Sequence, residues 1–531
     1  MIARLFLKAG LKMGLMVGLA LAAIAAEAQT PRRGGTLIVS IAAEPPTYDC
    51  HASQTFATIH AVAPSYSTLL RFDLDAYPRV VGDVAESWEV SANGLTYSFR
   101  LREGIRFHDG STLTAGDVKA SYERLRNPPA GVVSVRQALF EDIAAIETPD
   151  SRTTVFRLKA VNVAMPEIFA SPWNCLYSAA RLAADPDYPT KKVMGTGPFR
   201  FIEHVRGSHW QAQRFDAYFR AGLPYLDGWR AVFFQNTTAL LNALQGGQVM
   251  ADFRGVTPAE RDRLVQTLGD QIRIEESPIV VMMMLAFNTA KPPFDDVRVR
   301  RALTLAIDRR AGSQALARLV PQHLLGGMMR PGAPYALPDD ELARLPGFGR
   351  DIAAARTEAR RLLAEAGRSN LGFTLINRNF ASSFVPVGVF LIDQWRQIGV
   401  TVEHRPLETA PWSSALLSGN FDVIMDASNE YSDEPALGLT KFLSSDRSPN
   451  NFSRRIDREL DRLYDLQRVA ADPLQRRALL ADFQRRAIDD AATLPLFWQL
   501  RPVPMRPNVR GWRLSPSNLL GQDLAEVWLA P

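Results

Sequence analysis

Cysteine and histidine are scarce in this 531-residue chain, which contains two cysteines and seven histidines. No CxxC pair occurs, and no histidine has another three or four positions away, so the ligand spacing typical of metal sites is missing. The GxSxG, HExxH and GxxxxGK motifs are also absent. Catalytic triads assemble from residues distant in sequence, so these absences do not exclude an enzyme. They favour binding over catalysis and predict neither a metal nor a cofactor.

Long apolar runs are absent after residue 28, so no later membrane-spanning helix is predicted. Residues 1–28 have a basic start, small and apolar residues at 14–26, and the small-x-small sequence Ala26-Glu27-Ala28. This order is typical of a cleaved secretory signal peptide. A membrane anchor is disfavoured because the apolar run is shorter than the roughly 20 residues that a spanning helix needs. The basic residues of this segment are Arg4, Lys8 and Lys12.

Cleavage after Ala28 leaves no cysteine at the new N-terminus, which excludes a lipid anchor there. An exported protein without an anchor is retained where an outer membrane encloses a periplasm, so we expect a periplasmic protein. In that oxidising compartment Cys50 and Cys175 are predicted to form a disulfide, with two buried free thiols as the alternative. Cys50 and His51 are a possible metal pair, but no second pair accompanies them.

Charge and composition are those of an ordinary globular protein. The net charge of +5 falls to +3 without the signal peptide, and the basic residues are dispersed, so no nucleic-acid partner is predicted. The positive sign permits acidic ligands without requiring them. A mature chain of about 500 residues exceeds what one hydrophobic core supports, so two or more domains are expected.

Hydrophobic periodicity predicts an α/β protein. The first part of the chain has strand patterns at 34–41, 96–101 and 154–158, and an amphipathic helix opening at the N-cap Thr114. Strongly apolar strands are expected at 280–287 and 494–500. Between them, helices and strands interleave, as in an α/β domain. The helices are expected at 297–310 after an N-cap at Asp295 or Asp296, and at 351–366, 384–398, 457–470 and 473–490, with strands near 372–377, 400–405 and 421–425.

Four long motifs, in order, carry a family resemblance. The first is DVAESWEVSANGLTYSFRLREGIRFHDGSTLTAGDVKASYERL at 83–125, followed by GTGPFRF at 195–201. FNTAKPPFDDVRVRRALTLAID at 287–308 and NNFSRRIDRELDRL at 450–463 complete the set. The chain resembles solute-binding protein family 5, the periplasmic dipeptide-, oligopeptide- and nickel-binding proteins of ABC importers. The resemblance spans nearly all of the mature chain.

This resemblance implies a two-lobed periplasmic-binding-protein fold with an additional α+β subdomain in the first lobe. The apolar strands 280–287 and 494–500 are then the two crossings between the lobes. Carried onto this chain, lobe I comprises 29–70, 190–287 and 500–531, its extra subdomain 71–189, and lobe II 288–499. Aromatic residues of the first motif, such as Phe99 and Phe107, are expected to pack in the subdomain core rather than to bind ligand.

The resemblance also implies a function. We expect the solute-binding component of an ABC importer, which captures a peptide or peptide-like molecule between two closing lobes and delivers it to permease subunits in the inner membrane. The protein is expected to be a monomer and not an enzyme. A non-peptide solute, such as a nickel complex, haem, an oligosaccharide or an opine-like conjugate, is the alternative in the same role. A periplasmic hydrolase and a chaperone or sensory partner are the remaining alternatives.

The carboxylate of a peptide needs a paired cation in a closed cleft, because an unpaired charge is costly to desolvate. Dipeptide-binding relatives place an arginine in a strand–loop segment that corresponds to Asn377-Arg378-Asn379-Phe380. The resemblance therefore implies Arg378 as the carboxylate partner, with Asn379 and Phe380 beside the ligand. A guanidinium suits this role because its fork matches a carboxylate. The alternative is an exposed loop arginine.

The amine site departs from the peptide-binding pattern. In relatives an aspartate lies four residues before a proline that corresponds to Pro435, and here that position is Tyr431. Glu430 or Asp433 would have to replace it, so the pattern disfavours an unmodified dipeptide and makes a ligand with a blocked or displaced amine a candidate. Further candidates to line the cleft are Trp412, Tyr48 and Thr47. The helix with Arg298, Arg300, Arg301 and Arg309 is expected to present a solvated basic face.

Overall fold

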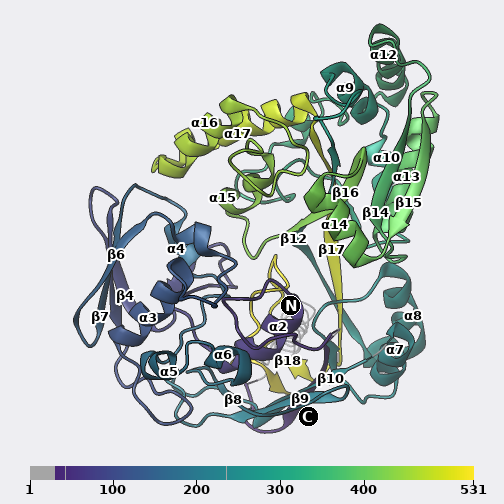
Figure 1. Ribbon diagram of the computed structural model, residues 1–531. Helices are drawn as coiled ribbons and strands as arrows, with labels where there is room; N and C mark the ends of the chain where they lie inside the picture. The colour runs from purple at the N-terminus through teal and green to yellow at the C-terminus, as the bar shows by residue number, and fades with distance from the viewer. Residues whose placement is uncertain (1–29, 42, 235) are drawn as a thin grey trace, which may run out of the picture.

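The computed structural model describes residues 30–41, 43–234 and 236–531. The predicted signal peptide at 1–28 lies outside this range. The described chain forms two lobes joined by long strands, with a smaller sheet and its helices at the side of the first lobe (Figure 1). This agrees with the α/β fold class predicted from the sequence.

Two long antiparallel strands connect the lobes. β12 (Arg273–Phe287) and β17 (Thr493–Met505) pair from Arg273↔Met505 to Ala286↔Thr493. The register shifts between Ile279 and Met282, so a bulge lies midway along the ribbon. The apolar runs predicted at 280–287 and 494–500 lie within these two strands. Because both strands belong to one sheet of eleven strands, the lobes share a continuous backbone ladder.

The first lobe contains one half of this sheet, in the order β11-β1-β10-β9-β8, with β1 parallel to β10 and β11. Its core includes Trp210 and Trp229, both fully buried. The strands are β1 (Thr36–Ile41), β8 (Phe199–Val205), β9 (His209–Arg214), β10 (Gly228–Phe233) and β11 (Ala251–Asp252), with a short ladder of β18 (Val509–Arg510) and β19 (Trp528–Leu529). The helices are α2 (Phe56–Val62), α5 (Ala179–Ala184), α6 (Tyr188–Lys191), α7 (Thr237–Gln245) and α8 (Pro258–Leu268).

The extra subdomain is built on a separate sheet of order β4-β5-β7-β6, with a small hairpin beside it. Phe99 and Phe107 are buried in its core, as the sequence predicts. Its main helix begins with a capping box in which Thr114 and Asp117 satisfy the first amides. The elements are β2 (Leu70–Phe72), β3 (Val80–Gly82), β4 (Ala85–Val90), β5 (Thr96–Leu101), β6 (Ile143–Asp150), β7 (Thr153–Leu158), α3 (Ala115–Arg126) and α4 (Met165–Phe169).

The second lobe holds the other half of the large sheet, in the order β15-β14-β16-β12. β14 runs parallel to both β15 and β16. The strands are β13 (Gln322–Leu324), β14 (Gly372–Arg378), β15 (Thr401–Leu407) and β16 (Val423–Asn429). The helices are α9 (Val297–Leu305), α10 (Arg309–Leu316), α11 (Asp339–Leu342), α12 (Ile352–Glu365), α13 (Phe384–Arg396), α14 (Thr409–Ser418), α15 (Pro435–Gly438), α16 (Arg458–Val469) and α17 (Pro473–Asp490).

The basic segment at 297–310 differs from its prediction in two ways. Asp296 caps the first helix as expected, but a second N-cap at Asp308 divides the segment into α9 and α10. Arg300 and Arg309 are buried, so the predicted solvated face is wrong for these two side chains. Arg309 donates to the carbonyls of Pro495, Thr304 and Gly347, and thereby ties its helix to β17. Both arginines are structural rather than anion-binding.

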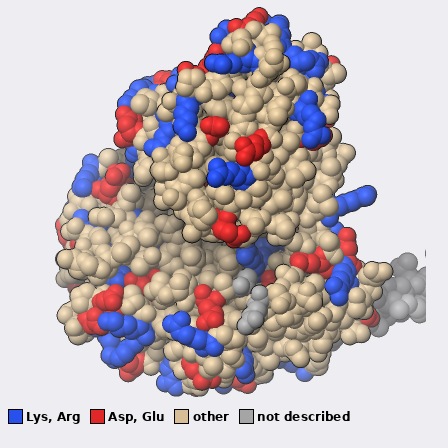
Figure 2. Space-filling model, turned by 45° about the vertical axis from the view of Figure 1, so that its right-hand side comes forward, with Lys and Arg blue, Asp and Glu red and all other residues tan. Residues whose placement is uncertain are grey.

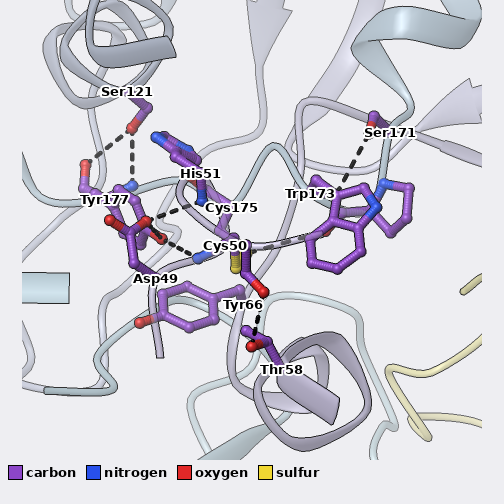
Figure 3. Close-up of a disulfide and its surroundings, with 12 residues drawn as sticks. Asp49, Cys50, His51, Thr58, Tyr66, Ser121, Ser171, Trp173, Cys175 and Tyr177 are labelled. Atoms are coloured by element: carbon purple, nitrogen blue, oxygen red, sulfur yellow. Dashed lines mark hydrogen bonds between the residues drawn. A yellow bond between two sulfur atoms is a disulfide. The ribbon is translucent and has the colours of Figure 1, made fainter. Parts of the chain in front are cut away.

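A disulfide, shown in Figure 3, joins the loop after β1 to the subdomain, and a buried ion pair adds a second connection. Cys50 and Cys175 are bonded, with their Cα atoms 6.1 Å apart. The preceding residue, Asp49, forms a bidentate ion pair with Arg124 of α3, and both side chains are almost fully buried. Tyr177 donates a further hydrogen bond to the Asp49 carboxylate at 3.0 Å. These contacts hold the subdomain against the first lobe.

Candidate functional site: the cleft between the lobes

The strand directions place two sets of loops opposite each other. In the second lobe, Asn429 at the end of β16 pairs with Val281, in the middle of β12, so β16 and the parallel β14 end toward the first lobe. In the first lobe, β11 is antiparallel to β17 and ends toward the second lobe, as does the parallel β1. Ligands of α/β sheets bind outside the carboxyl ends of the strands. Figure 2 shows a deep hollow at this level, with basic side chains inside it.

Arg378 is the last residue of β14 and lies among aromatic rings. Its guanidinium carbon is 4.2 Å from the centroid of Phe380 and 5.3 Å from that of Trp412. One nitrogen donates to the Thr409 hydroxyl at 3.1 Å, whereas the buried Nε has no partner among the described residues. Burial lowers the pKa of Arg378 and the nearby positive charge of Arg254 lowers it further, whereas the negative charge of Asp426 opposes this shift. An arginine in this state has unused donors for an anion.

The neighbours of Arg378 hold it in place. Trp412 is half-buried and donates its indole N–H to the Met425 carbonyl at 3.1 Å. Phe380 is 38% exposed, which is unusual for a phenylalanine and leaves ring surface for a ligand. Asn379 is exposed and donates to Glu408, which follows β15 and is the N-cap residue of α14. Arg378, Phe380 and Trp412, three of the predicted site residues, therefore form one cluster in the second lobe.

Glu430 follows β16 and is the acidic residue of the predicted amine site that remains without an ion pair in the described structure. Burial raises its pKa, while the positive charges of Lys441 and Arg136 lower it. Lys441 is itself paired with Asp426 and so contributes little net charge. The Glu430 carbonyl accepts a hydrogen bond from Ser517 of the first lobe at 3.3 Å. Glu430 therefore lies where the lobes meet.

Tyr431 and Asp433, the other predicted amine partners, are already engaged. Asp433 forms a bidentate ion pair with Arg330, with a closest distance of 2.6 Å, and its side chain is 4% exposed. Tyr431 is buried and donates to the carbonyl of Glu167 in the subdomain at 3.4 Å. Neither side chain is directed to a free ligand amine. The sequence reasoning did not predict these partners because Arg330 and Glu167 lie far away along the chain.

Thr47 and Tyr48 shape the loop that follows β1. The Thr47 hydroxyl accepts from the Asp49 amide at 3.2 Å, and the backbone carbonyl of Thr47 accepts from the Thr58 hydroxyl. Tyr48 is half-buried, packs 5.4 Å from the Trp210 ring and shares a hydrogen bond of 2.9 Å with His204. Their polar groups are satisfied within the first lobe, so a positioning role for the loop fits them better than direct ligand contact.

Two further arginines near the cleft were missed by the sequence analysis. Arg254 follows β11, is exposed, and lies 4.4 Å from the ring centroid of Phe56. Arg136 lies 4.1 Å from the ring of Trp173 and donates to the Ser53 carbonyl at 2.8 Å. Burial lowers the pKa of Arg136 to about 10. Neither residue stands in a motif, so no sequence signal distinguishes it from a surface arginine.

A small hollow adjoins Glu430 on the second-lobe side. Its apolar wall is formed by the flexible side chains of methionines together with Trp498, whose indole donates to the Gly327 carbonyl. Methionine side chains adapt to irregular shapes, so this wall suits an apolar or sulfur-containing group. The apolar lining residues are Val280, Met282, Met328, Met329, Pro435, Leu439 and Trp498.

A larger hollow lies elsewhere, between the segment 63–83 and the C-terminal segment 511–527. Most of its charged side chains pair with one another, as in Arg220 with Glu526 and Arg513 with Asp75. Residues at the carboxyl ends of the parallel strands are not among its lining residues. We therefore place the candidate site in the cleft.

Other kinds of site have no support in the described part of the chain. No cluster of three or more histidine, cysteine, aspartate or glutamate side chains is suited to hold a metal ion there. Among the helices of residues 30–41, 43–234 and 236–531, none has the length and apolar character needed to cross a bilayer.

Comparison with known proteins identifies the family. Residues 79–450 match the family described as bacterial extracellular solute-binding proteins, family 5 Middle. The matched region covers more than half of the chain, so this protein belongs to that family. The predicted resemblance to solute-binding protein family 5 is confirmed.

Similar curated proteins are named as glutathione binders. The glutathione-binding protein GsiB of Pectobacterium atrosepticum is 31% identical over 347 residues, which cover 65% of this chain and 63% of that protein. GsiB of Escherichia coli O1:K1 is 32% identical over 358 residues, or 66% and 65% of the two chains. The alignment thus spans slightly less than two thirds of these relatives.

Solved structures show that the fold is the predicted one. AgaA of A. tumefaciens R10, solved with agropinic acid, has a TM-score of 0.78 at 24% identity and covers 94% of this chain and 99% of its own. CtaP of Listeria monocytogenes has a TM-score of 0.82 at 21% identity, with 94% and 100% covered. DppA of Helicobacter pylori, solved with the peptide STSA, has a TM-score of 0.79 at 20% identity, with 94% and 99% covered.

Proposed function

We propose that this protein is the periplasmic solute-binding component of an ABC importer and that it captures a small peptide-like molecule between its lobes. The observation that carries the proposal is Arg378 at the carboxyl end of β14, with an unused donor beside exposed aromatic surface. Glu430 lies on the same side of the cleft, where it can accept from an ammonium group. Arg378 and Glu430 thus offer one partner for each end of a zwitterion.

The similar proteins support this ligand class. Both GsiB relatives are named for glutathione, a peptide with a displaced amine. A displaced amine also fits the departure at Tyr431, where peptide-binding relatives have aspartate. An opine-like conjugate or another non-peptide solute with a carboxylate remains the second candidate, because Asp433 is paired with Arg330 and leaves only Glu430 for an amine.

The transport role follows from the family and from the two-lobed form. We propose export by the signal peptide to the periplasm without a lipid anchor, a monomeric state, and delivery to permease subunits in the inner membrane. Binding without turnover is the proposed activity, since two closing lobes capture a solute without breaking its bonds. A hydrolase would instead convert a peptide library, which pure protein can be tested for directly.

Mass spectrometry of the molecule released on denaturing natively purified protein tests the proposed ligand class. A peptide or amino-acid conjugate with a free carboxylate is expected. Release of haem, a nickel complex or an oligosaccharide would instead favour a non-peptide ligand in the same transport role. Recovery of importer permease from membranes with the purified protein tests the partner.

Lobe closure is expected to require the ligand. A ligand shifts the equilibrium between the open and closed forms only by the difference between its binding free energies for the two forms. A saturating ligand should therefore decrease the radius of gyration measured by solution scattering. A ligand that binds without compaction would contradict closure as the capture step.

Closure is also expected to depend on pH through Glu167. This subdomain residue accepts from Ser432 of the second lobe, and burial among Glu434 and Asp433 raises its pKa to about 8, although the hydrogen bond from Ser432 and the charge of Arg476 oppose the shift. On opening, the contact is lost and the pKa returns toward its ordinary value. The closed form therefore binds the additional proton, and affinity should fall as pH rises from about 5 to 8, by at most tenfold per pH unit.

Ligand titrations across this pH range measure the effect. Glu167→Gln removes the ionisable group while keeping the hydrogen-bonding shape, so its affinity should be nearly constant over the same range. An unchanged pH profile in the variant would show that another group is responsible.

A further inference from the structure

Three arginines of the cleft share an unusual environment. Among the described residues, the three shortest cation–π distances belong to Arg136 over Trp173 at 4.1 Å, Arg378 over Phe380 at 4.2 Å and Arg254 over Phe56 at 4.4 Å. Stacking on an aromatic face orients a guanidinium without using its N–H donors. These side chains are therefore held in place with their hydrogen-bonding edges available.

None of the three has a carboxylate within ion-pair distance in the described residues. Arg136 donates only to the carbonyls of Ser53 and Cys50, and Arg378 only to the Thr409 hydroxyl. The negative charge that acts on Arg254 is that of Asp252, whose carboxylate accepts from Ser40 and from the amides of Arg254 and Gly255. Some other arginines of the second lobe pair with acids, as Arg330 does with Asp433, and others, such as Arg309, donate to backbone carbonyls.

The cleft consequently carries an excess of positive charge. Glu430 lies near Arg136 and has no ion pair among the described residues, and burial raises its pKa. Asp426 and Lys441 neutralise each other. Arg254 of the first lobe is close enough to Arg378 of the second lobe to lower its pKa. These two like charges repel across the cleft, so they disfavour closure when no anion lies between them.

We infer that the cleft selects an anionic peptide-like solute with two carboxylates, one bound by Arg378 and the other by Arg254. This rests on the proposed function, and it adds a first-lobe anchor and a charge requirement. A solute that reaches both guanidiniums replaces repulsion between the lobes by attraction, so its two carboxylates stabilise the closed form in particular. Arg136 lies near Glu430 and adds to the positive field, while Glu430 accepts from a single amine.

A probe series that differs in carboxylate number tests the inference by calorimetric titration. Glutathione has two carboxylates and one amine, its glycine ethyl ester has one carboxylate and one amine, and trialanine has one of each at similar length. Glutathione should bind at least about tenfold more tightly than the ester or trialanine, because a charge-assisted hydrogen bond is lost with each blocked carboxylate. Equal affinities for glutathione and its ester would overturn the requirement for two carboxylates.

Two variants distinguish a specific contact of Arg254 with the ligand from a general effect of net charge on affinity. Arg254→Gln should weaken glutathione at least tenfold and change the affinity for trialanine much less. Arg263→Gln is the matched control, because Arg263 is an exposed first-lobe arginine on α8. A loss in the control equal to that in Arg254→Gln would show that net charge, not the Arg254 site, determines affinity. The melting temperatures of both variants verify that they are folded.

Glutarate distinguishes failure of this inference from failure of the proposed function. It has two carboxylates but no peptide group, and we expect it to raise the melting temperature of the wild-type protein and not that of Arg254→Gln. Stabilisation by glutarate without binding of any peptide-like probe would support the two-carboxylate site and contradict the peptide-like ligand. Tight trialanine binding without a response to glutarate would support the proposed function and overturn this inference.

Discussion

Arg378→Glu is expected to abolish binding of the carboxylate ligand, with a loss of about 100-fold to 1,000-fold or more in affinity. The substitution removes the guanidinium at the end of β14 and places a negative charge where the ligand carboxylate would lie. Titration calorimetry with the molecule identified from the native protein measures the effect. Arg378→Gln should lose less affinity, because it removes the positive charge without adding repulsion.

The fold should survive this substitution. The Arg378 side chain makes one hydrogen bond, to Thr409, and no ion pair among the described residues. A glutamate at this position meets the positive charge of Arg254 but also the negative charge of Asp426, so the melting temperature should be nearly unchanged. Arg263→Gln again serves as the control, with wild-type affinity expected. Full binding by a folded Arg378→Glu protein would remove Arg378 from the site.

Removing the disulfide is expected to have the largest effect on stability. Cys50 and Cys175 are 125 residues apart, and a cross-link that closes so long a loop restricts the unfolded chain strongly. In the chain-entropy account such a loop corresponds to roughly 4 to 5 kcal/mol of unfolding free energy. The double variant Cys50→Ser/Cys175→Ser should therefore unfold at a clearly lower urea concentration than the wild-type protein.

Reduction of the wild-type protein supplies the control for this second prediction. Added dithiothreitol should lower the unfolding midpoint of the wild-type protein to that of the double variant and leave the variant unchanged. The single variants should resemble the double variant, since either substitution prevents the bond. Because Asp49 and Arg124 remain paired next to the cysteines, the lobe and subdomain should still dock in the native state. Equal midpoints for wild-type and variant proteins would contradict the prediction.

Much of the fold was predictable because its signals are local. The apolar runs at 280–287 and 494–500 lie in β12 and β17, and Thr114 and Asp296 begin helices where capping residues predict them. These features depend on residues a few positions apart. The division at Asp308 was missed because the apolar periodicity continues through both α9 and α10, although an N-cap residue was present in the sequence.

The candidate site was predictable only in part. Arg378, Phe380 and Trp412 form a cluster, and the motif match that proposed Arg378 needed only its own segment of chain. The ion pairing of Asp433 could not be inferred in the same way, because its partner Arg330 is 103 residues away in the sequence. Arg254 has no motif, and its proximity to Arg378 follows from where β11 and β14 end in one shared sheet.

The amino-acid sequence alone determined the family, the α/β class and the arginine at the end of a second-lobe strand, because those depend on periodicity and on motifs within short segments. Only the tertiary structure decided which charges are free. Asp433, Arg300 and Arg309 are engaged by distant groups, whereas Arg254 and Arg378 form no ion pair among the described residues, and the charge of Arg254 lowers the pKa of Arg378. Ion pairing depends on distances of a few ångströms, and those are set when strands far apart in the chain join one sheet.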